Sequence, residues 1–98
     1  MHEHGLARDL WPQLEQIAKA KGFVRVTRLD MTVGMLHGVT AEFLAGSLKH
    51  AFEGTCFQGA ETNVYVVDPG LELAADRGGP ATATGWELLI TCIEGELA

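Results

Sequence analysis

Two segments with the apolar spacing of helices alternate with strand-like segments, and this alternation limits the folds open to the chain. Residues 6–21 carry apolar side chains at spacings of three and four, which places them on one side of a helix. These side chains are Leu6, Leu10, Leu14, Ile17 and Ala18. Pro12 predicts a kink if the helix starts near Gly5, and costs little if Asp9 is the cap. We expect the early start with a weak first turn, and an end at Gly22.

Residues 23–33 predict a long strand. Val24 and Val26 share one parity, whereas Leu29, Met31 and Val33 share the other. A strict two-residue repeat cannot place both sets on one face. We therefore expect a bulge near Thr27–Arg28, or partial cover of both faces.

The second helix is predicted over residues 41–53, with Thr40 as its N-cap and Gly54 as its end. Residues 61–67 are apolar on both parities from Val64 onward, which predicts a strand covered on both sides. The last strand is predicted over residues 86–94. Its expected inward-facing residues are Trp86, Leu88, Ile90 and Cys92.

This order, helix–strand–helix–strand–strand, predicts an α+β fold: a two-layer sandwich with two helices on one face of a three-stranded mixed sheet. All 98 residues form one domain, because a chain of this length has room for one core. The last two strands are expected to pair as an antiparallel hairpin. The connection between them, residues 68–85, exceeds the usual limit of about 12–15 residues. It is predicted to be functional, mobile or the remnant of a lost module.

The charge composition of the chain limits the classes of molecule that it can bind. The chain has 13 acidic and 7 basic residues and a formal charge of −6, which argues against nucleic acid or an anionic membrane as the main partner. No apolar run reaches the roughly 18 residues of a membrane span, and the first residues lack the pattern of a secretory signal. Two cysteines without CxxC spacing predict reduced thiols in a cytoplasmic protein.

The start of the chain, Met1-His2-Glu3-His4, is its most unusual feature for chemistry. A free α-amine has a pKa of about 7.7–8.0 and can give up its proton to a metal near neutral pH. The imidazole of His2 lies one residue away, so the amine, backbone amide nitrogens and imidazole can surround one ion. Four nitrogens in a plane suit Ni(II) or Cu(II) rather than zinc or magnesium. The alternative is a frayed, solvated terminus.

The other polar candidates are weaker. Glu3 can bind metal or stabilise the start of the helix. His37, in the turn between Gly34 and Gly38, is either a ligand or an exposed loop residue. We expect His4 and His50 on the surface.

The sequence gives no positive reason to expect an enzyme. It has no GxSxG elbow, no phosphate-binding GxxxxGK[ST], no dinucleotide fingerprint and no HExxH. Cys56 is expected to be a buried or half-buried thiol and Cys92 a small core residue.

Four stretches carry a resemblance to a known family. They are the opening MHE followed by a helix from Leu6, VTRL at 26–29 running into VGMLHGV at 33–39, the helix from AEFL at 41–44 to AFEGT at 51–55, and GWELLI at 85–90. In this order and spacing they resemble the HypA/HybF family of hydrogenase nickel-incorporation proteins. The resemblance covers nearly all of the chain except residues 68–84.

The resemblance implies a nickel metallochaperone for nickel–iron hydrogenase, and in some organisms for urease. Its partners would be the hydrogenase large-subunit precursor or a maturation GTPase. The family's site uses the terminal amine, backbone nitrogens and the histidine at position two, which selects Met1, His2 and Glu3 here. Some members add a ligand from the loop before the second helix. Thr40 offers none, which leaves His37 or Glu42 as substitutes.

One departure from the family is large. Members insert a CxxC…CxxC zinc ribbon between the last two strands, whereas residues 68–85 contain no cysteine. A four-thiolate zinc site is therefore impossible, and we expect nickel but no zinc. The alternative function is a metal-independent adapter or dimerising module, in which residues 86–90 offer a strand edge to a partner or to a second copy.

Overall fold

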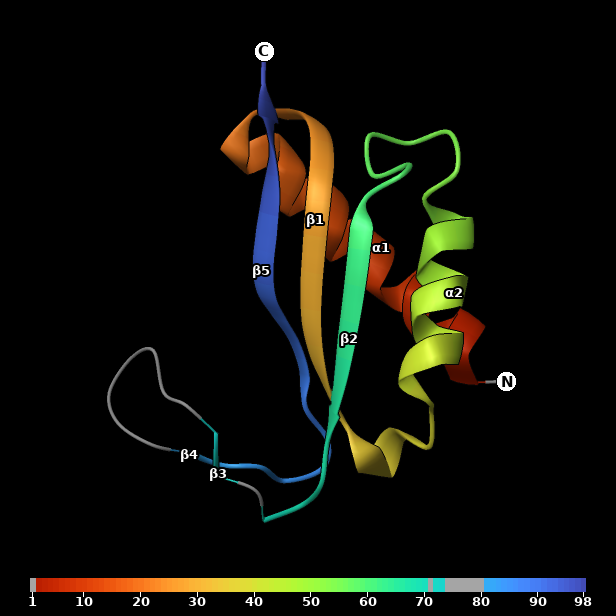
Figure 1. Cartoon of the computed structure of the whole chain (residues 1–98), viewed down its shortest axis with the longest axis vertical. Coiled ribbons are helices and arrows are strands. Elements are labelled where there is room, and N and C mark those ends of the chain that lie inside the picture. Colours follow the sequence, from red (N-terminus) through yellow and green to blue (C-terminus); the bar gives the residue numbers. More distant parts are fainter. Residues whose placement is uncertain (1, 71, 74–80) are drawn as a thin grey trace.

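The computed structural model describes residues 2–70, 72–73 and 81–98 of the chain (Figure 1). The main elements are α1 (His2–Lys21), β1 (Phe23–Gly34), α2 (Ala41–Ala51), β2 (Glu61–Val67) and β5 (Leu88–Leu97). Shorter ones are the 3₁₀ turn η1 (Met35–His37), β3 (Glu72–Leu73) and β4 (Ala81–Thr82). Both long helices pack on one face of the three long strands (Figure 1), which confirms the predicted two-layer α+β architecture.

The strand order corrects one prediction. The sheet runs β2-β1-β5, with β1 parallel to β2 and antiparallel to β5. β2 and β5 are therefore separated by β1 and do not form a hairpin. The reason is α2, which carries the chain from the end of β1 back past the sheet, so that the next strand pairs in parallel. β5 then pairs along the other side of β1.

A bulge in β1 reconciles the two parities seen in the sequence. Val26 pairs with Gly95 and Arg28 pairs with Glu94, so Thr27 is the extra residue. As predicted for this position, the bulge lets Val26 and Leu29 both face the helices, where neither is exposed. A further register shift follows Phe23 and leaves Val24 56% exposed.

A bulge in β5 moves Cys92 off the expected core face, whereas Leu88 and Ile90 pack against the core as predicted. Met31 pairs with Ile90 and Asp30 with Cys92, so Thr91 is the extra residue. Adjacent residues of β1 point to opposite faces, and Ile90 and Cys92 therefore do so as well. Cys92 is half-buried beside Asp30 rather than in the core.

The helices agree closely with the sequence, with shifts at their ends. α1 begins at His2, earlier than the expected start near Gly5, and remains helical through Pro12. The backbone N–H of Phe43 donates to Oγ1 of Thr40 at 3.3 Å, which confirms the predicted N-cap of α2. α2 ends at Ala51, two residues before the predicted end, and a turn through Gly54 follows.

The core lies between the helices and the sheet. Its largest fully buried side chains are Phe52, Phe57, Leu10, Leu14, Leu29, Met31, Leu44, Leu48, Val26 and Val33. Trp11 of α1 packs against two of them, with its ring centroid 5.4 Å from that of Phe57 and 6.1 Å from that of Phe52. The apolar stripes predicted on the two helices therefore face the core.

The sheet face away from the helices has no cover in the described chain. Tyr65 is 53% exposed and Leu89 is 46% exposed, so the expectation that β2 is covered on both sides is wrong. The centre of this face is polar instead. Arg28 donates to both carboxylate oxygens of Asp30, at 3.1 and 2.7 Å, and the amide of Asn63 donates to the same carboxylate at 2.8 Å.

The connection between β2 and β5 is not wholly irregular. β3 pairs with β4 in antiparallel fashion, and the N–H of Gly70 donates to the carbonyl of Ala83 at 2.8 Å. Residues 71 and 74–80 of the predicted loop lie outside the described residues. Among the helices that the structure describes, none is both long and apolar enough to cross a membrane.

Candidate metal centre

The predicted metal site starts at the first turn of α1. The backbone of His2, Glu3 and His4 is helical, whereas Met1 and the side chains of these three residues lie outside the described part of the structure. The first N–H groups of an α-helix have no acceptor within the helix. The backbone nitrogens of His2 and Glu3 are therefore not required for the hydrogen bonds of α1.

The end of a helix also imposes an electrostatic condition. Its N-terminus carries a partial positive charge, which opposes a divalent cation. A metal can bind there only when its ligands supply compensating negative charge. Loss of amide protons, or a carboxylate such as that of Glu3, meets this condition.

His37, the candidate from the second loop, lies in η1 and is half-buried. Its Nε2 lies 3.0 Å from the carbonyl oxygen of Trp86, and the two rings meet edge to face with centroids 5.4 Å apart. Because a carbonyl can only accept, Nε2 is the donor in this contact, and Nδ1 is the ring nitrogen left for a metal. A metal-ligating histidine often donates its other ring N–H to a backbone carbonyl, a carboxylate or water.

The segment that holds His37 is fixed by further contacts with residues before β5. The N–H of Gly34 donates to the carbonyl of Glu87 at 2.8 Å, and that of Leu36 donates to the carbonyl of Gly85 at 2.9 Å. The carboxylate of Glu87 accepts hydrogen bonds from the backbone of Thr84 and Gly85. The bond from the backbone of Thr84 is the largest cause of the lowered pKa of Glu87.

The alternative ligand, Glu42, lies in the first turn of α2 and is exposed. Thr40 uses its hydroxyl to cap that helix. Figure 1 draws the start of α1 beside α2, and η1 below the first turn of α2. The described residues show no contact between the start of α1 and His37 or Glu42.

The remaining candidates are not gathered into a site. His50 is exposed, as predicted, and its Nδ1 lies 3.0 Å from Oε1 of Glu53. Cys56 is half-buried, also as predicted. The side chain of His4 lies outside the described residues. Within the described part of the chain, no three His, Cys, Asp or Glu residues are grouped so that they could hold a metal ion.

The Arg28–Asp30–Asn63 cluster is the polar group that the sequence did not single out. Its signal was the alternation of a cation and a carboxylate, Arg28 and Asp30, in the middle of the long strand. Hydrogen bonds from Arg28 are the largest cause of the lowered pKa of Asp30. Both oxygens of this carboxylate are engaged, so the cluster serves the sheet rather than a metal.

Comparison with known proteins places these features in a family. The family described as "Hydrogenase/urease nickel incorporation, metallochaperone, hypA" matches residues 1–72. A hydrogenase maturation factor HypA from Cupriavidus necator is 33% identical over 93 residues, covering 87% of this chain and 78% of that protein. The HypA of Xanthobacter autotrophicus is 34% identical over 68 residues, covering 69% of this chain and 60% of that protein.

The fold has a solved counterpart as well. The solution structure of the nickel metallochaperone HypA from Helicobacter pylori superposes over the whole of both chains with a TM-score of 0.68, at 16% identity. That identity supports the likeness of fold alone. The family match over residues 1–72, more than half of the sequence, is what assigns the chain. The chain belongs to the HypA family of hydrogenase and urease nickel-incorporation proteins.

Proposed function

We propose that this chain binds Ni(II) at its first residues and delivers it during the maturation of nickel–iron hydrogenase or urease. Its family is one of nickel metallochaperones and maturation factors rather than enzymes. The observation that carries the proposal for this chain is the sequence Met1-His2-Glu3, at the start of the segment that matches the family. The helical start of α1 adds backbone nitrogens with no acceptor in the helix.

The proposed ligands are the amine of Met1, the backbone nitrogen and the imidazole of His2, and Glu3 through its backbone nitrogen or its carboxylate. The first three can share one plane with the metal, because the amine and the imidazole each form a chelate ring with the backbone nitrogen of His2, and Nδ1 of His37 can supply the fourth nitrogen of that plane. Chelation by consecutive backbone nitrogens needs each N–Cα–C–N unit to be nearly flat, whereas helical residues have ψ of about −42°. The first turn of α1 must therefore open when the metal binds. This ordering and opening lowers the affinity, which suits a protein that must release its cargo.

His37 is proposed as an additional ligand through Nδ1. The support is its hydrogen bond from Nε2 to the carbonyl of Trp86, which orients the ring and assigns the proton. Glu42, in the first turn of α2, is the alternative.

No zinc site is proposed. The chain has two cysteines, and the structure separates them by the sheet. Cys56 lies beside Trp11 in the helical layer, whereas Cys92 pairs with Asp30 on the opposite face. A tetrahedral zinc centre with thiolate ligands needs its sulfurs around one ion.

The receiving partner is proposed to be the hydrogenase large-subunit precursor or a maturation GTPase in the cytoplasm. A second function, a metal-independent adapter or a homodimer, is favoured by one observation. β5 is an outer strand of the sheet, and Trp86 and Leu89 beside its start are 60% and 46% exposed. Such a strand can accept another strand at its free edge.

The experiment that tests the proposed function is a titration of the untagged chain with Ni(II), followed by the visible absorbance of a planar four-nitrogen nickel centre. We expect one equivalent to bind. His2→Ala should abolish the band, whereas His50→Ala, which removes an exposed histidine of α2, should leave it unchanged. Equal binding by all three proteins would refute the proposed site. Partner binding that survives both His2→Ala and a chelator would favour the adapter.

A further inference from the structure

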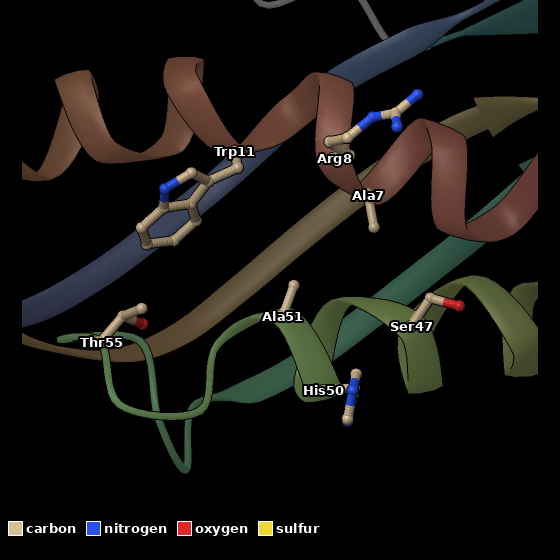
Figure 2. A pocket seen from close by; sticks show the side chains of 7 residues that line it. All are labelled: Ala7, Arg8, Trp11, Ser47, His50, Ala51 and Thr55. Atoms are coloured by element: carbon tan, nitrogen blue, oxygen red, sulfur yellow. The ribbon is translucent and has the colours of Figure 1, made fainter.

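A groove runs along the outside of the helical layer, between α1 on one side and α2 with its following turn on the other. It consists of two hollows of about 290 and 270 Å³, which share Trp11 and Thr55. We call it the helix groove. It is bordered by Arg8, Trp11 and Lys19 of α1, and by His50, Ala51 and Thr55 across from them. Figure 2 shows Ala7 and Ala51 between the two helices, with Arg8 and His50 extending to either side.

The side of α1 that borders the helix groove forms a stripe of residues separate from the stripe that faces the core. Arg8, Trp11, Glu15 and Lys19 follow one another at spacings of three and four, so they share one face of the helix. This stripe is distinct from Leu10 and Leu14, which face the core with 1% and 0% exposure. α1 therefore has a second organised face, on which Trp11 packs partly against the core while Arg8, Glu15 and Lys19 are exposed.

Trp11 marks the middle of that face. Its ring packs edge-on against Phe57, yet the residue remains half-buried and lines both hollows. Small residues such as Ala7 and Ala51 leave the space beside it open. Each hollow is close to the lower limit of small-molecule sites, about 300 Å³. Both therefore suit apolar side chains of another protein better than a cofactor.

The charges at the two ends of the helix groove indicate which charged residues a bound partner would carry. Arg8 and Lys19 are eleven residues apart, which is about 16 Å along a helix and close to three turns. The chain as a whole carries −6. The strand cations Arg25 and Arg28 lie within 4 Å of carboxylates, Glu96 in one case and Asp30 and Glu94 in the other. The helix groove is thus a largely apolar site with a cation at each end and one carboxylate, that of Glu15, between Trp11 and Lys19.

We propose that the helix groove docks an amphipathic α-helix of the protein that receives nickel. Apolar residues of that helix would contact Trp11, and two carboxylates three turns apart would face Arg8 and Lys19. Residues eleven apart on a helix point in nearly the same direction, so one helix can present both charges. The recipient's identity rests on the proposed function, whereas the docking chemistry does not.

The position of the helix groove gives it a role in transfer. Ala7 and Arg8, at its first end, lie one helical turn after Glu3 on the same helix. One turn is about 5.4 Å. A partner held in the helix groove would have one end beside the proposed nickel ligands, which shortens the path between donor and recipient.

The test uses a defined probe, a synthetic helical peptide of about 18 residues with leucines along one face and two glutamates three turns apart on that face. The protein is the full chain with Trp86→Phe, so that Trp11 is its single tryptophan. We expect the peptide to shift the emission of Trp11. The matched peptide with lysines in place of the two glutamates should bind about tenfold more weakly, as expected for two exposed ion pairs.

Charge reversal in the protein makes the test specific. Arg8→Glu with Lys19→Glu should exchange the preference, so that the lysine peptide binds more tightly. A control with Lys49→Glu, on α2 outside the helix groove, should keep the original preference. Circular dichroism checks that each variant is folded. Equal binding of both peptides, an unchanged preference after the double reversal, or no binding up to about 1 mM would overturn the proposal.

The same variants separate this inference from the proposed function. The double reversal should leave Ni(II) binding unchanged, because Arg8 and Lys19 are not among the proposed ligands. It should also reduce nickel transfer to a hydrogenase large-subunit precursor. If the unmodified chain did not bind Ni(II), the proposed function would be refuted, whereas the peptide experiment would remain valid.

Discussion

Asp30 shows how the hydrogen bonds of a single carboxylate can join two strands of the sheet. It lies in the central strand, on the face without helices, and is only 7% exposed. A buried carboxylate is costly unless hydrogen bonds stabilise its charge. Arg28 supplies two of these bonds and Asn63 a third, so the cluster joins β1 to β2.

Asp30→Asn should lower the free energy of unfolding by about 1–2 kcal/mol at neutral pH, because it breaks charged hydrogen bonds to a half-exposed guanidinium. The lowered pKa of Asp30 sets the pH dependence. Its contribution is complete above its ordinary pKa of about 3.9 and is lost as the pH falls through the lower folded value. Urea unfolding of both proteins from pH 7 to pH 2 measures the difference.

Tyr65→Phe serves as the control on the same face, since it leaves this cluster intact and should not change the pH dependence. A stability difference between wild type and Asp30→Asn that stays constant down to pH 2 would contradict this account of the carboxylate.

The sequence predicted that His37 lies in a loop, but it did not predict which residues His37 contacts. The turn between Gly34 and Gly38 identified it as a loop histidine. Its partner, Trp86, is 49 residues away. Such a contact depends on how the strands are ordered, which spacing alone cannot provide. The same holds for the cluster of Arg28 and Asp30 with Asn63, which needs β1 and β2 to be neighbours.

Most helices and strands could be predicted because each has a local sequence signal. The stripe over residues 6–21 and the cap at Thr40 predicted both helices, and the two parities of residues 23–33 predicted the bulge at Thr27. The order of the strands in the sheet could not be predicted from these local signals. The hairpin expectation failed because the crossover through α2 sets the pairing of β2. The bulge at Thr91 was not predicted because Trp86, Leu88, Ile90 and Cys92 are all apolar at every second position.

Gly34, the last residue of β1, tests the junction between β1 and the segment before β5. A Cβ on Gly34 would overlap the carbonyl group of Gly85. Gly34→Ala should therefore lower the free energy of unfolding by about 1–3 kcal/mol, as overpacking does, and should disturb the contact between His37 and Trp86. Thermal unfolding and the fluorescence of Trp86 in a Trp11→Phe background measure the two effects.

Gly46→Ala is the matched control, because nothing lies within 4 Å of a Cβ at this exposed position of α2. Alanine in a helix should raise the free energy of unfolding by about 0.5–1 kcal/mol. If both substitutions had the same sign, the close approach of Gly34 and Gly85 would not explain the result.

At the scale of the whole molecule, one layer of helices and one sheet enclose an apolar core. Structural zinc contributes directly to folding where it is present. In this chain, Leu10, Leu14 and Phe52 are buried between the layers, and we propose that this packing is sufficient for the fold. Stability and nickel binding should therefore be independent of each other.

Metal removal should accordingly leave the fold intact. After dialysis against EDTA, we expect the midpoint of thermal unfolding to be unchanged, and elemental analysis of the purified chain should find no stoichiometric zinc. A variant with Cys56→Ser and Cys92→Ser controls for thiol binding and should give the same zinc content. A large fall in the midpoint after chelation, restored by zinc, would contradict the proposed zinc-free architecture.

The most direct test of the central claim changes the first amino group and nothing in the folded body. One extra residue before Met1 moves the α-amine away from His2 but preserves every side chain of the chain. We predict that the untagged protein gives a planar nickel band at one equivalent of Ni(II), and that the extended protein gives none. An equally strong band from the extended protein would show that nickel does not bind through the terminal amine.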